Sequence, residues 1–316
     1  MKTTSKSDAR KVVIAALLGN LGIAIAKFVA AWLSGSTAIL AEGVHSLADT
    51  GNQGLLLVGM GLAKQHRPDL YPLGRDKESY FWAFIVALLL FFVGGVFAVY
   101  EGVHKLFGVE TTHGSPLIPL GVLLVSLLME GGSFFVASRE FNKTRGSKGF
   151  FEALFSGKDP TIPVVLLEDT AAVAGLVIAF LAIGVSALTH NPMADAIGSI
   201  VIGVLLCAVG LVLARYTRSL LLGEGVTPQV REQATRLIEE TPGVLKVTQF
   251  LSMHLGPEAV ILALKVRFAP KMALEEVEAV IDTIEARVRA EVPEMSKIFI
   301  EPDSDYDESR DLSLRP

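Results

Sequence analysis

The sequence predicts a bundle of six transmembrane helices followed by a small α+β domain. Three observations indicate this fold class: an apolar composition, six long apolar stretches, and a change to a soluble-like composition after Arg218. The chain has 316 residues, of which 51% are hydrophobic and 19% charged, and its mean hydropathy is +0.50. Because an average soluble domain carries about 25% charged residues, the composition is typical of an integral membrane protein.

Charge and cysteine content exclude two other classes of protein. The net charge of −5 is mild and no basic cluster stands out, so we expect no nucleic-acid partner. The single cysteine, Cys207, excludes an intramolecular disulfide framework and a multi-cysteine metal site. The basic N-terminal stretch MKTTSKSDARK leads into a long apolar run without an obvious small-residue cleavage site. We therefore expect a first span there, and not a removed signal peptide.

Six apolar stretches are long enough to cross a membrane, which takes about 20 residues for a hydrocarbon core of roughly 30 Å. They cover residues 12–34, 37–63, 80–105, 116–138, 162–187 and 193–215. The third and sixth are clear from hydropathy. The second and fifth are weaker, because each carries ionisable residues.

The distribution of Lys and Arg orients the six stretches. These residues crowd the N-terminal segment and the links after the second and fourth stretches, whereas the other connections hold only Lys105 near a span end. The positive-inside rule then places both termini in the cytoplasm and requires an even number of spans. The expected organisation is a cytoplasmic segment 1–11, a transmembrane domain 12–218, a cytoplasmic domain 219–303 and a disordered tail 304–316. A prokaryotic plasma membrane is the expected location.

Residues 219–303 show the patterns of a small sheet covered by helices on one face. Apolar residues at helical spacing predict helices over 228–240 and 273–291. Alternating or short apolar runs predict strands over 245–255, 259–268 and 297–302. The predicted order is therefore αββαβ, with the first helix ended by the TPG turn at 241–243.

The second span, with the stretch AILAEGVHSLADTGNQGLLLVGMGL, carries polar residues on one helical face. His45 and Asp49 are four residues apart, so they lie one turn apart on the same face, and Glu42 and Asn52 extend this stripe. His45 and Asp49 lie ~12–18 Å from the outer end of the span, near the bilayer midplane. Intramembrane ionisable residues mark ion or substrate pathways. The stripe thus predicts a functional site, and the alternative is a polar face that only packs inside the bundle.

The fifth span places Glu168 and Asp169 roughly 12 Å along its helix, again near the middle of the bilayer. Adjacent helical residues point about 100° apart. One of the two is therefore expected to bind a ligand, and the other to carry protons or to pair with a basic group. Imidazole and carboxylate ligands together suit zinc or a neighbouring divalent metal.

Other polar residues in the chain have weaker claims to a function. Glu130 lies well inside the fourth span and is an accessory candidate. Glu101 and Asp195 lie near span ends, where a cap or an ion pair is expected, and Lys27 is expected to snorkel or to pair with an acid. His254 is the only histidine after Arg218, and a lone histidine is more often structural.

Together these features resemble the cation diffusion facilitator family of metal–proton antiporters. The resemblance rests on AEGVHSLADT in the second span, YPLGRDKES before the third, DAIGSIVIG at the start of the sixth and TPGV in the C-terminal domain, and it covers about residues 12–303. It implies a homodimeric exporter of Zn²⁺ or a similar cation. It also implies alternating access around a tetrahedral midplane site and a ferredoxin-like cytoplasmic domain with a regulatory and dimerisation role.

The resemblance also implies a ligand set, with one departure. Asp169 matches the second ligand position of the fifth span, whereas Val165 occupies the first and cannot bind metal. The stretch LLEDTAAVAG resembles the divergent branch that includes zinc transporters assigned to mitochondria. The hypothesis is a three-ligand site of His45, Asp49 and Asp169, completed by Glu168, Asn52 or water. Glu42 and Glu130 are accessory candidates.

Two further metal sites of the family are expected to be absent or altered. Tyr71 and Arg75 stand where the loop after the second span often holds a second site, so we expect no such site. In the C-terminal domain the usual histidine ligands are mostly missing, which leaves Glu301, Asp303 and His254 as candidates.

Metal binding displaces protons from its ligands, which gives a direct physical route to metal–proton antiport. Zn²⁺ is the expected cargo, with Mn²⁺, Fe²⁺ or Co²⁺ as alternatives because of the acidic fifth span. A membrane metalloenzyme that uses the same ligands is one rival interpretation, although no HExxH or nucleophile motif supports it. A metal sensor or scaffold with a vestigial site is the other.

Overall fold

A computed structural model describes residues 6–34, 37–107, 117–145, 149–189, 191 and 193–303 of the chain. The side chains of some helical residues, including Glu42 and His45, lie outside this description, and so does the tail 304–316, for which disorder is expected. The described chain divides into two compact units. The first comprises Met1–Gln65 and Lys77–Arg218, and the second comprises His66–Asp76 and Ser219–Pro316.

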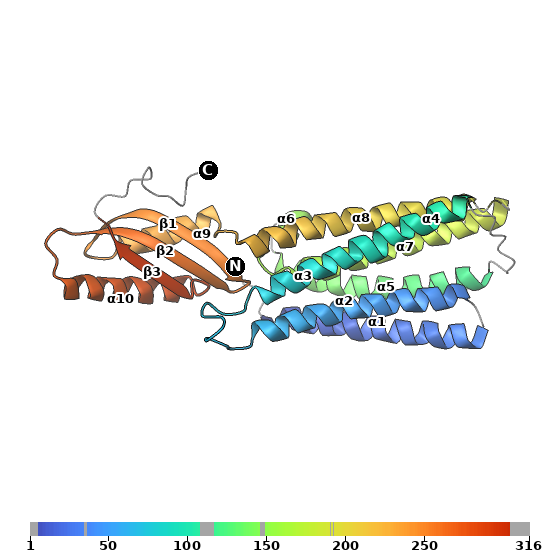
Figure 1. The fold of residues 1–316 in the computed structure, drawn as a ribbon, viewed down its shortest axis with the longest axis horizontal. Coiled ribbons are helices and arrows are strands. Elements are labelled where there is room, and N and C mark those ends of the chain that lie inside the picture. The colour runs from blue at the N-terminus through green and yellow to red at the C-terminus, as the bar shows by residue number, and fades with distance from the viewer. Residues whose placement is uncertain are drawn as a thin grey trace. The chain divides into compact units, whose positions relative to one another are not determined.

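The first unit is helical, and Figure 1 shows long helices over the six expected stretches. The elements are α1 (Lys6–Ser34), α2 (Thr37–Ala63), α3 (Glu78–Leu89), η1 (Leu90–Val96), α4 (Phe97–Phe107), α5 (Leu117–Thr144), α6 (Phe150–Ser156), α7 (Thr161–Thr189) and α8 (Met193–Leu222). Within the described residues, five helical segments are long and apolar enough to cross a membrane: those in α1, α3 to α4, α5, α7 and α8. Helix α2 is not among these five, so its role as a sixth span stays a prediction.

The core of the helical unit is an apolar cluster to which α1, α2, α3, α7 and α8 contribute. Its fully buried members include Val13 of α1, Ala83 of α3, Val165 of α7 and Leu213 of α8. Val165 is the residue that stands at a ligand position of the family pattern. Its side chain is part of the packed core. An apolar side chain, and not another polar group, therefore occupies this ligand position.

Glycines bring α8 into backbone contact with η1 and α4. A Cβ atom added at Gly203 would lie 2.6 Å from the backbone nitrogen of Val99, and one at Gly210 would lie 2.9 Å from Cα of Phe91. A Cβ atom at Gly95 would lie 2.7 Å from the backbone nitrogen of Cys207. Real Cβ atoms do not approach backbone this closely, so only glycine fits at these positions. Small residues at helix interfaces are typical of membrane bundles, where close backbone approach supplies the packing energy.

The π-helical segment η1 interrupts the third apolar stretch at its two adjacent glycines, Gly94 and Gly95. Hydropathy does not distinguish a π turn from an α turn, so this segment was not predicted. Such segments are rare and appear mostly as single turns inside α-helices. Here Cys207 and Gly210 of α8 approach this segment.

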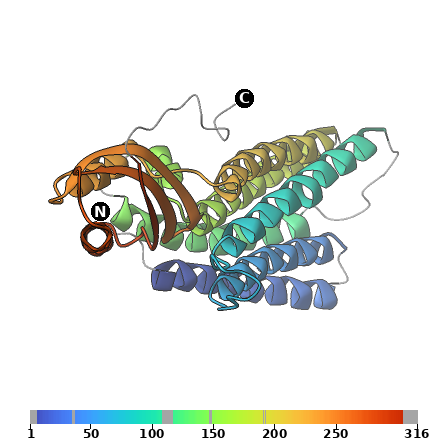
Figure 2. The same ribbon diagram turned by 60° about the vertical axis from the view of Figure 1, so that its left-hand side comes forward.

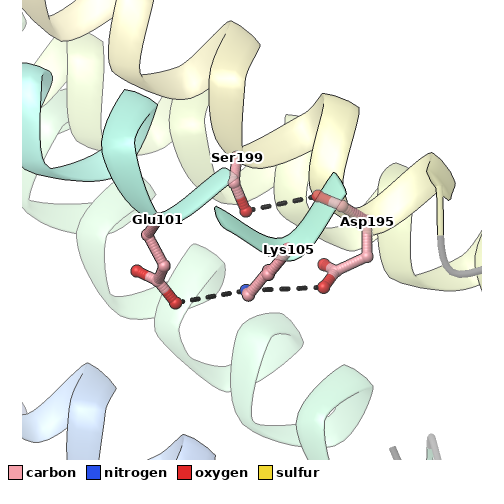
Figure 3. Close-up of polar contacts among 4 residues, drawn as sticks. All are labelled: Glu101, Lys105, Asp195 and Ser199. Atoms are coloured by element: carbon pink, nitrogen blue, oxygen red, sulfur yellow. Dashed lines mark hydrogen bonds and ion pairs between the residues drawn. The ribbon is translucent and has the colours of Figure 1, made fainter. Parts of the chain in front are cut away.

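An ion triad joins α4 to α8 at the end of the same helix pair. Lys105 Nζ lies 3.2 Å from Glu101 Oε1 and 3.5 Å from Asp195 Oδ2, as Figure 3 shows. Ser199 Oγ donates to the backbone oxygen of Asp195 at 3.2 Å, one turn along α8. Glu101 and Asp195 are therefore each paired with Lys105, which confirms the ion pair expected for acids near span ends.

The second unit has the expected order αββαβ. It contains α9 (Pro228–Glu239), β1 (Val244–Gly256), β2 (Ala259–Phe268), α10 (Leu274–Glu291) and β3 (Lys297–Pro302), drawn in orange to red in Figure 2. The sheet order is β1-β2-β3, with β1 and β2 antiparallel and β2 and β3 parallel. Gly243, with φ of 95°, makes the turn between α9 and β1 in a conformation that glycine adopts without strain.

The helices α9 and α10 pack against one face of this sheet. Ile238 of α9 and Ile284 of α10 belong to one buried cluster with Leu262 and Leu264 of β2. The expected arrangement of helices on a single face is therefore observed. This cluster is the core on which the folding of the unit depends.

We expect Leu262→Ala to destabilise this unit by about 2–5 kcal/mol, because it leaves a cavity in a fully buried part of the cluster. Urea unfolding of the C-terminal unit followed by circular dichroism measures the change. Leu245→Ala on β1 is the matched control, since Leu245 is 56% exposed, and it should cost no more than about 0.5 kcal/mol. Equal losses for both variants would contradict this assignment of the core.

Candidate metal centre

Asp49 and Asn52 of α2 are both buried among the helices, with exposed fractions of 8% and 7%. They are three residues apart, so they share one side of the helix. Burying a carboxylate is costly unless hydrogen bonds or a cation compensate the charge.

Glu168 and Asp169 of α7 are buried as well, although adjacent helical positions point in different directions. Within the described residues, Oε2 of Glu168 and Oδ2 of Asp169 have no hydrogen-bond partner. Buried polar atoms are nearly always paired, and each exception calls for an explanation. A bound cation satisfies two such carboxylate oxygens.

A hydrogen bond connects the two candidate helices. Asn52 Nδ2 donates to Glu168 Oε1 at 2.7 Å, between residues 116 apart in sequence. Both side chains are buried, so the bond is shielded from solvent and fixes the orientation of the Glu168 carboxylate. The structure thus brings together the stripe on the second span and the acidic pair on the fifth.

Electrostatic interactions extend this group to a third helix. The charges of Asp49, Asp169 and Glu130 all act on Glu168, and those of Asp49 and Glu130 act on Asp169. Glu130 lies on α5 and is 4% exposed. We call these four residues, Asp49, Glu130, Glu168 and Asp169, the acidic group. Four buried carboxylates from three helices strongly favour a cation near them.

The side chains of His45 and Glu42 lie outside the described part of the structure. Among the side chains that are described, no three His, Cys, Asp or Glu lie close enough together to hold a metal ion. The acidic group is thus an electrostatic neighbourhood, and its members do not converge on one point. The predicted ligand set of His45, Asp49 and Asp169 remains a proposal.

Polar residues of α1 also reach this region. Lys27 Nζ donates to Ser46 Oγ at 2.7 Å, and Asn20 Nδ2 donates to Gln53 Oε1 at 3.2 Å. Asn20, Ser46 and Gln53 were not predicted as candidates. A signal was nevertheless present, because uncharged amides are uncommon in long apolar helices and are usually paired there.

In the loop after α2, Tyr71 and Arg75 contact each other. The guanidinium of Arg75 lies over the ring of Tyr71, 4.8 Å from the ring centroid. This is a cation–π contact. Both residues belong to the segment His66–Asp76, which is part of the second unit.

The three candidates in the C-terminal unit do not form one group. Lys265 Nζ lies 3.5 Å from Glu301 Oε1 and 3.6 Å from Asp303 Oδ2, so both acids are paired with the same lysine. His254 is buried on β1 opposite Val260, whereas Glu301 lies opposite Lys265. These two positions on β2 are about 16 Å apart along the strand.

Two family models match the chain. Residues 13–222 match the cation efflux transmembrane domain, and residues 226–305 match the cytoplasmic domain of cation efflux proteins. Together they cover most of both units and every residue of the acidic group.

Several curated proteins are similar in sequence. The mitochondrial proton-coupled zinc antiporter SLC30A9 of Mus musculus is 33% identical over 252 residues, which are 78% of this chain and 44% of that protein. Metal tolerance protein C4 of Arabidopsis thaliana is 32% identical over 84% of this chain and 58% of that protein. Magnetosome protein MamB of Paramagnetospirillum magneticum is 24% identical over 96% of this chain and 97% of that protein. The chain thus spans about half the length of the first two relatives.

Among solved structures, a nickel form of the MamM CTD matches 25% of this chain and 100% of its own chain. The match has 14% sequence identity and a TM-score of 0.24.

Proposed function

Because the chain belongs to the cation efflux family of metal transporters, we propose that it exports a divalent metal ion, with Zn²⁺ as the first candidate, in exchange for protons. The observation that carries this proposal is the acidic group, in which buried carboxylates from α2, α5 and α7 act on one another. Such a concentration of negative charge inside a bundle is costly without cations to balance it. Divalent metal ions and protons are the two cations that a metal–proton antiporter exchanges.

The proposed ligands are His45 and Asp49 of α2 and Asp169 of α7, with Glu168 as the candidate fourth ligand. The unpartnered oxygens of Asp169 and Glu168 support this set. Asn52 holds the other oxygen of Glu168, which is the role of an outer-shell residue that orients a ligand. Glu130 adds charge from α5 without being required as a ligand, and Glu42 is an accessory candidate.

The proposed cycle uses competition between metal and protons. Metal binds deprotonated ligands, so it displaces protons when it enters, and protons displace it on the side where they are abundant. Free imidazole titrates near neutral pH, so a histidine ligand is suited to this exchange. The bundle is proposed to have six spans, including α2, and to open alternately to either side of the membrane.

The choice of metal rests on ligand chemistry and on relatives. Imidazole and carboxylate ligands suit Zn²⁺, and relatives named as zinc antiporters support it. The similarity to MamB and the acid-rich α7 keep Mn²⁺, Fe²⁺ and Co²⁺ as alternatives.

The C-terminal unit is proposed to join two copies of the chain into a homodimer, which the match of residues 226–305 supports. Both termini are proposed to lie in the cytoplasm, with the protein in a prokaryotic plasma membrane. Cross-linking in native membranes measures the first point, and accessibility of tags at each end measures the second.

Transport by purified protein in liposomes tests the proposal. With a pH gradient imposed, Zn²⁺, Mn²⁺, Fe²⁺ and Co²⁺ are offered one at a time, and metal uptake and proton flux are recorded together. We expect Zn²⁺ to move fastest, with protons moving in the opposite direction and without any second substrate. Metal binding without transport would instead favour a sensor, and uptake that is indifferent to the pH gradient would contradict antiport.

We expect Glu168→Gln to weaken metal binding about tenfold. Glutamine keeps an oxygen that accepts from Asn52, so the variant removes charge while preserving the hydrogen bond between α2 and α7. Isothermal titration of the solubilised protein with Zn²⁺ measures the effect. Glu101→Gln on α4 is the matched control. Unchanged affinity with lost proton flux would assign Glu168 to carrying protons and not to the metal.

A further inference from the structure

A lysine side chain is buried between α1 and α2, inside the helical unit. Lys27 of α1 is 6% exposed, and its Nζ donates to Oγ of Ser46 on α2 at 2.7 Å. Ser46 is itself 1% exposed. Among the Lys and Arg side chains of this unit that the structure describes, Lys27 is the buried one. The proposed ligand set makes no use of it.

The side chain of Lys27 extends into the bundle and does not snorkel to the nearer helix end. Lys27 lies seven residues, or about 10 Å, from the end of α1 at Ser34. Ser46 lies nine residues, or about 14 Å, from the start of α2 at Thr37. Both depths are counted from the same end of the bundle, because two residues link these helices in sequence. The ammonium is therefore deeper in the bundle than the backbone of Lys27.

The ammonium lies about one helical turn from Asp49. Ser46 precedes Asp49 by three residues, so the two share a side of α2. The register of the two side-chain hydrogen bonds between α1 and α2 places Ala24 of α1 opposite Asp49. Lys27 follows Ala24 by three residues. On both helices, then, one turn separates the contact of Lys27 from the level of Asp49.

A positive charge at this position acts on the acidic group. The hydroxyl of Ser46 accepts a hydrogen bond from Lys27 but carries no charge to balance the ammonium. Ionisable residues inside a membrane pair with one another and mark ion pathways. Over a distance of about one turn in a weakly polarisable interior, an ammonium stabilises carboxylates and repels a divalent cation. Lys27 is thus placed to oppose metal binding at Asp49.

We propose that Lys27 is a built-in counter-cation of the metal site, which weakens metal binding so that the ion can be released. The inference rests on the proposed metal export. An ion in transit must bind well enough to enter its site and weakly enough to leave it. Lys27 offsets part of the acidic charge in the metal-free protein and repels the bound ion in the loaded protein. It keeps its proton throughout, so this role needs no proton path.

Two variants remove the charge of Lys27: Lys27→Met, which fills a similar space, and Lys27→Gln, which still has an amide group to donate to Ser46. Isothermal titration of the solubilised proteins with Zn²⁺ at one pH measures the affinity. We expect both neutral variants to bind Zn²⁺ at least about tenfold more tightly than wild-type protein. In liposomes at saturating Zn²⁺, we expect their transport to fall at least threefold, because release becomes limiting.

Lys27→Arg is the conservative variant. It keeps the positive charge, so its affinity and its transport should both stay within threefold of wild-type protein. Lys105→Met is the matched control for the loss of a lysine charge from a span. Lys105 is paired with Glu101 and Asp195 near the helix end, so its replacement should leave the affinity for Zn²⁺ unchanged.

Unchanged or weaker Zn²⁺ binding by monodisperse Lys27→Met or Lys27→Gln would overturn the inference. A lysine that only packs α1 against α2 predicts weaker binding, since its loss would loosen the position of Asp49. Tighter binding with undiminished transport would overturn the role in release. If one neutral variant does not yield folded protein, the other decides.

The proposed function fails by a different result. Wild-type protein that neither binds nor moves Zn²⁺ or the alternative metals would refute metal export itself. That result is read without any variant, whereas the role of Lys27 is read from the difference between the neutral variants and wild-type protein. The two failures are therefore distinct.

Discussion

Replacing Asp49 with alanine is expected to abolish metal-dependent proton flux in liposomes, with a loss of at least a hundredfold. Asp49 is buried on α2, and its charge acts on both Glu168 and Asp169. Removing it deletes a proposed ligand and also reduces the negative charge that attracts a cation. His45→Ala is expected to have the same effect, since His45 precedes Asp49 by one helical turn.

The matched control is Asp195→Ala on α8. Asp195 is paired with Lys105 near the end of its helix and takes no part in the acidic group, so transport should fall by less than about threefold. Proton flux at the wild-type rate in either Asp49→Ala or His45→Ala would show that the site assignment is wrong. Metal binding measured on the same preparations separates a lost ligand from a lost conformational step.

Gly203→Leu is expected to prevent assembly of the helical unit. A Cβ atom there would lie 2.6 Å from the backbone nitrogen of Val99 and 2.8 Å from the carbonyl oxygen of Gly95. Because both are backbone atoms, no rotamer change relieves the clash, and the helices must separate. We expect a destabilisation of more than about 3 kcal/mol, at the upper end of overpacking effects. The yield of monodisperse protein and its thermal unfolding in detergent measure it.

Gly184→Leu on α7 is the control for the same chemical change, since a Cβ atom at Gly184 meets nothing within 4 Å. It should leave the yield and the unfolding temperature close to those of wild-type protein. Comparable losses from the two variants would show that backbone contact is not responsible, because leucine has a higher helix propensity than glycine and Gly184→Leu adds no clash.

Periodicity and hydropathy were sufficient to locate most of the helices and strands. The helix α2 begins at Thr37 and ends at Ala63, as the apolar stretch predicts, and β2 covers the alternating run from Ala259 to Phe268. These patterns are local, because each depends only on which face of one element is apolar. The π-helical segment η1 escaped prediction, since hydropathy and periodicity do not distinguish a π turn from an α turn within an apolar run.

The candidate site was predictable only in part. His45 and Asp49 are recognisable because four-residue spacing places them on one face of a helix, and Glu168 and Asp169 because charge is rare in a span. The bond from Asn52 to Glu168 was not predictable, since it depends on how α2 and α7 are rotated against each other. The same holds for Asn20 and Gln53, whose open hydrogen-bonding atoms appear only once α1 is packed against α2.

The glycine contacts between α8 and the segment from η1 to α4 have a mechanical consequence. Helices slide past one another when the side chains between them can exchange contacts. At this interface backbone atoms of the two helices face each other directly, without an intervening layer of side chains. Lys105 fastens the same two helices near one end through its pairs with Glu101 and Asp195. We therefore expect α4 and α8 to move together as one rigid body. Spin labels on α4 and α8 would then keep one separation throughout the transport cycle.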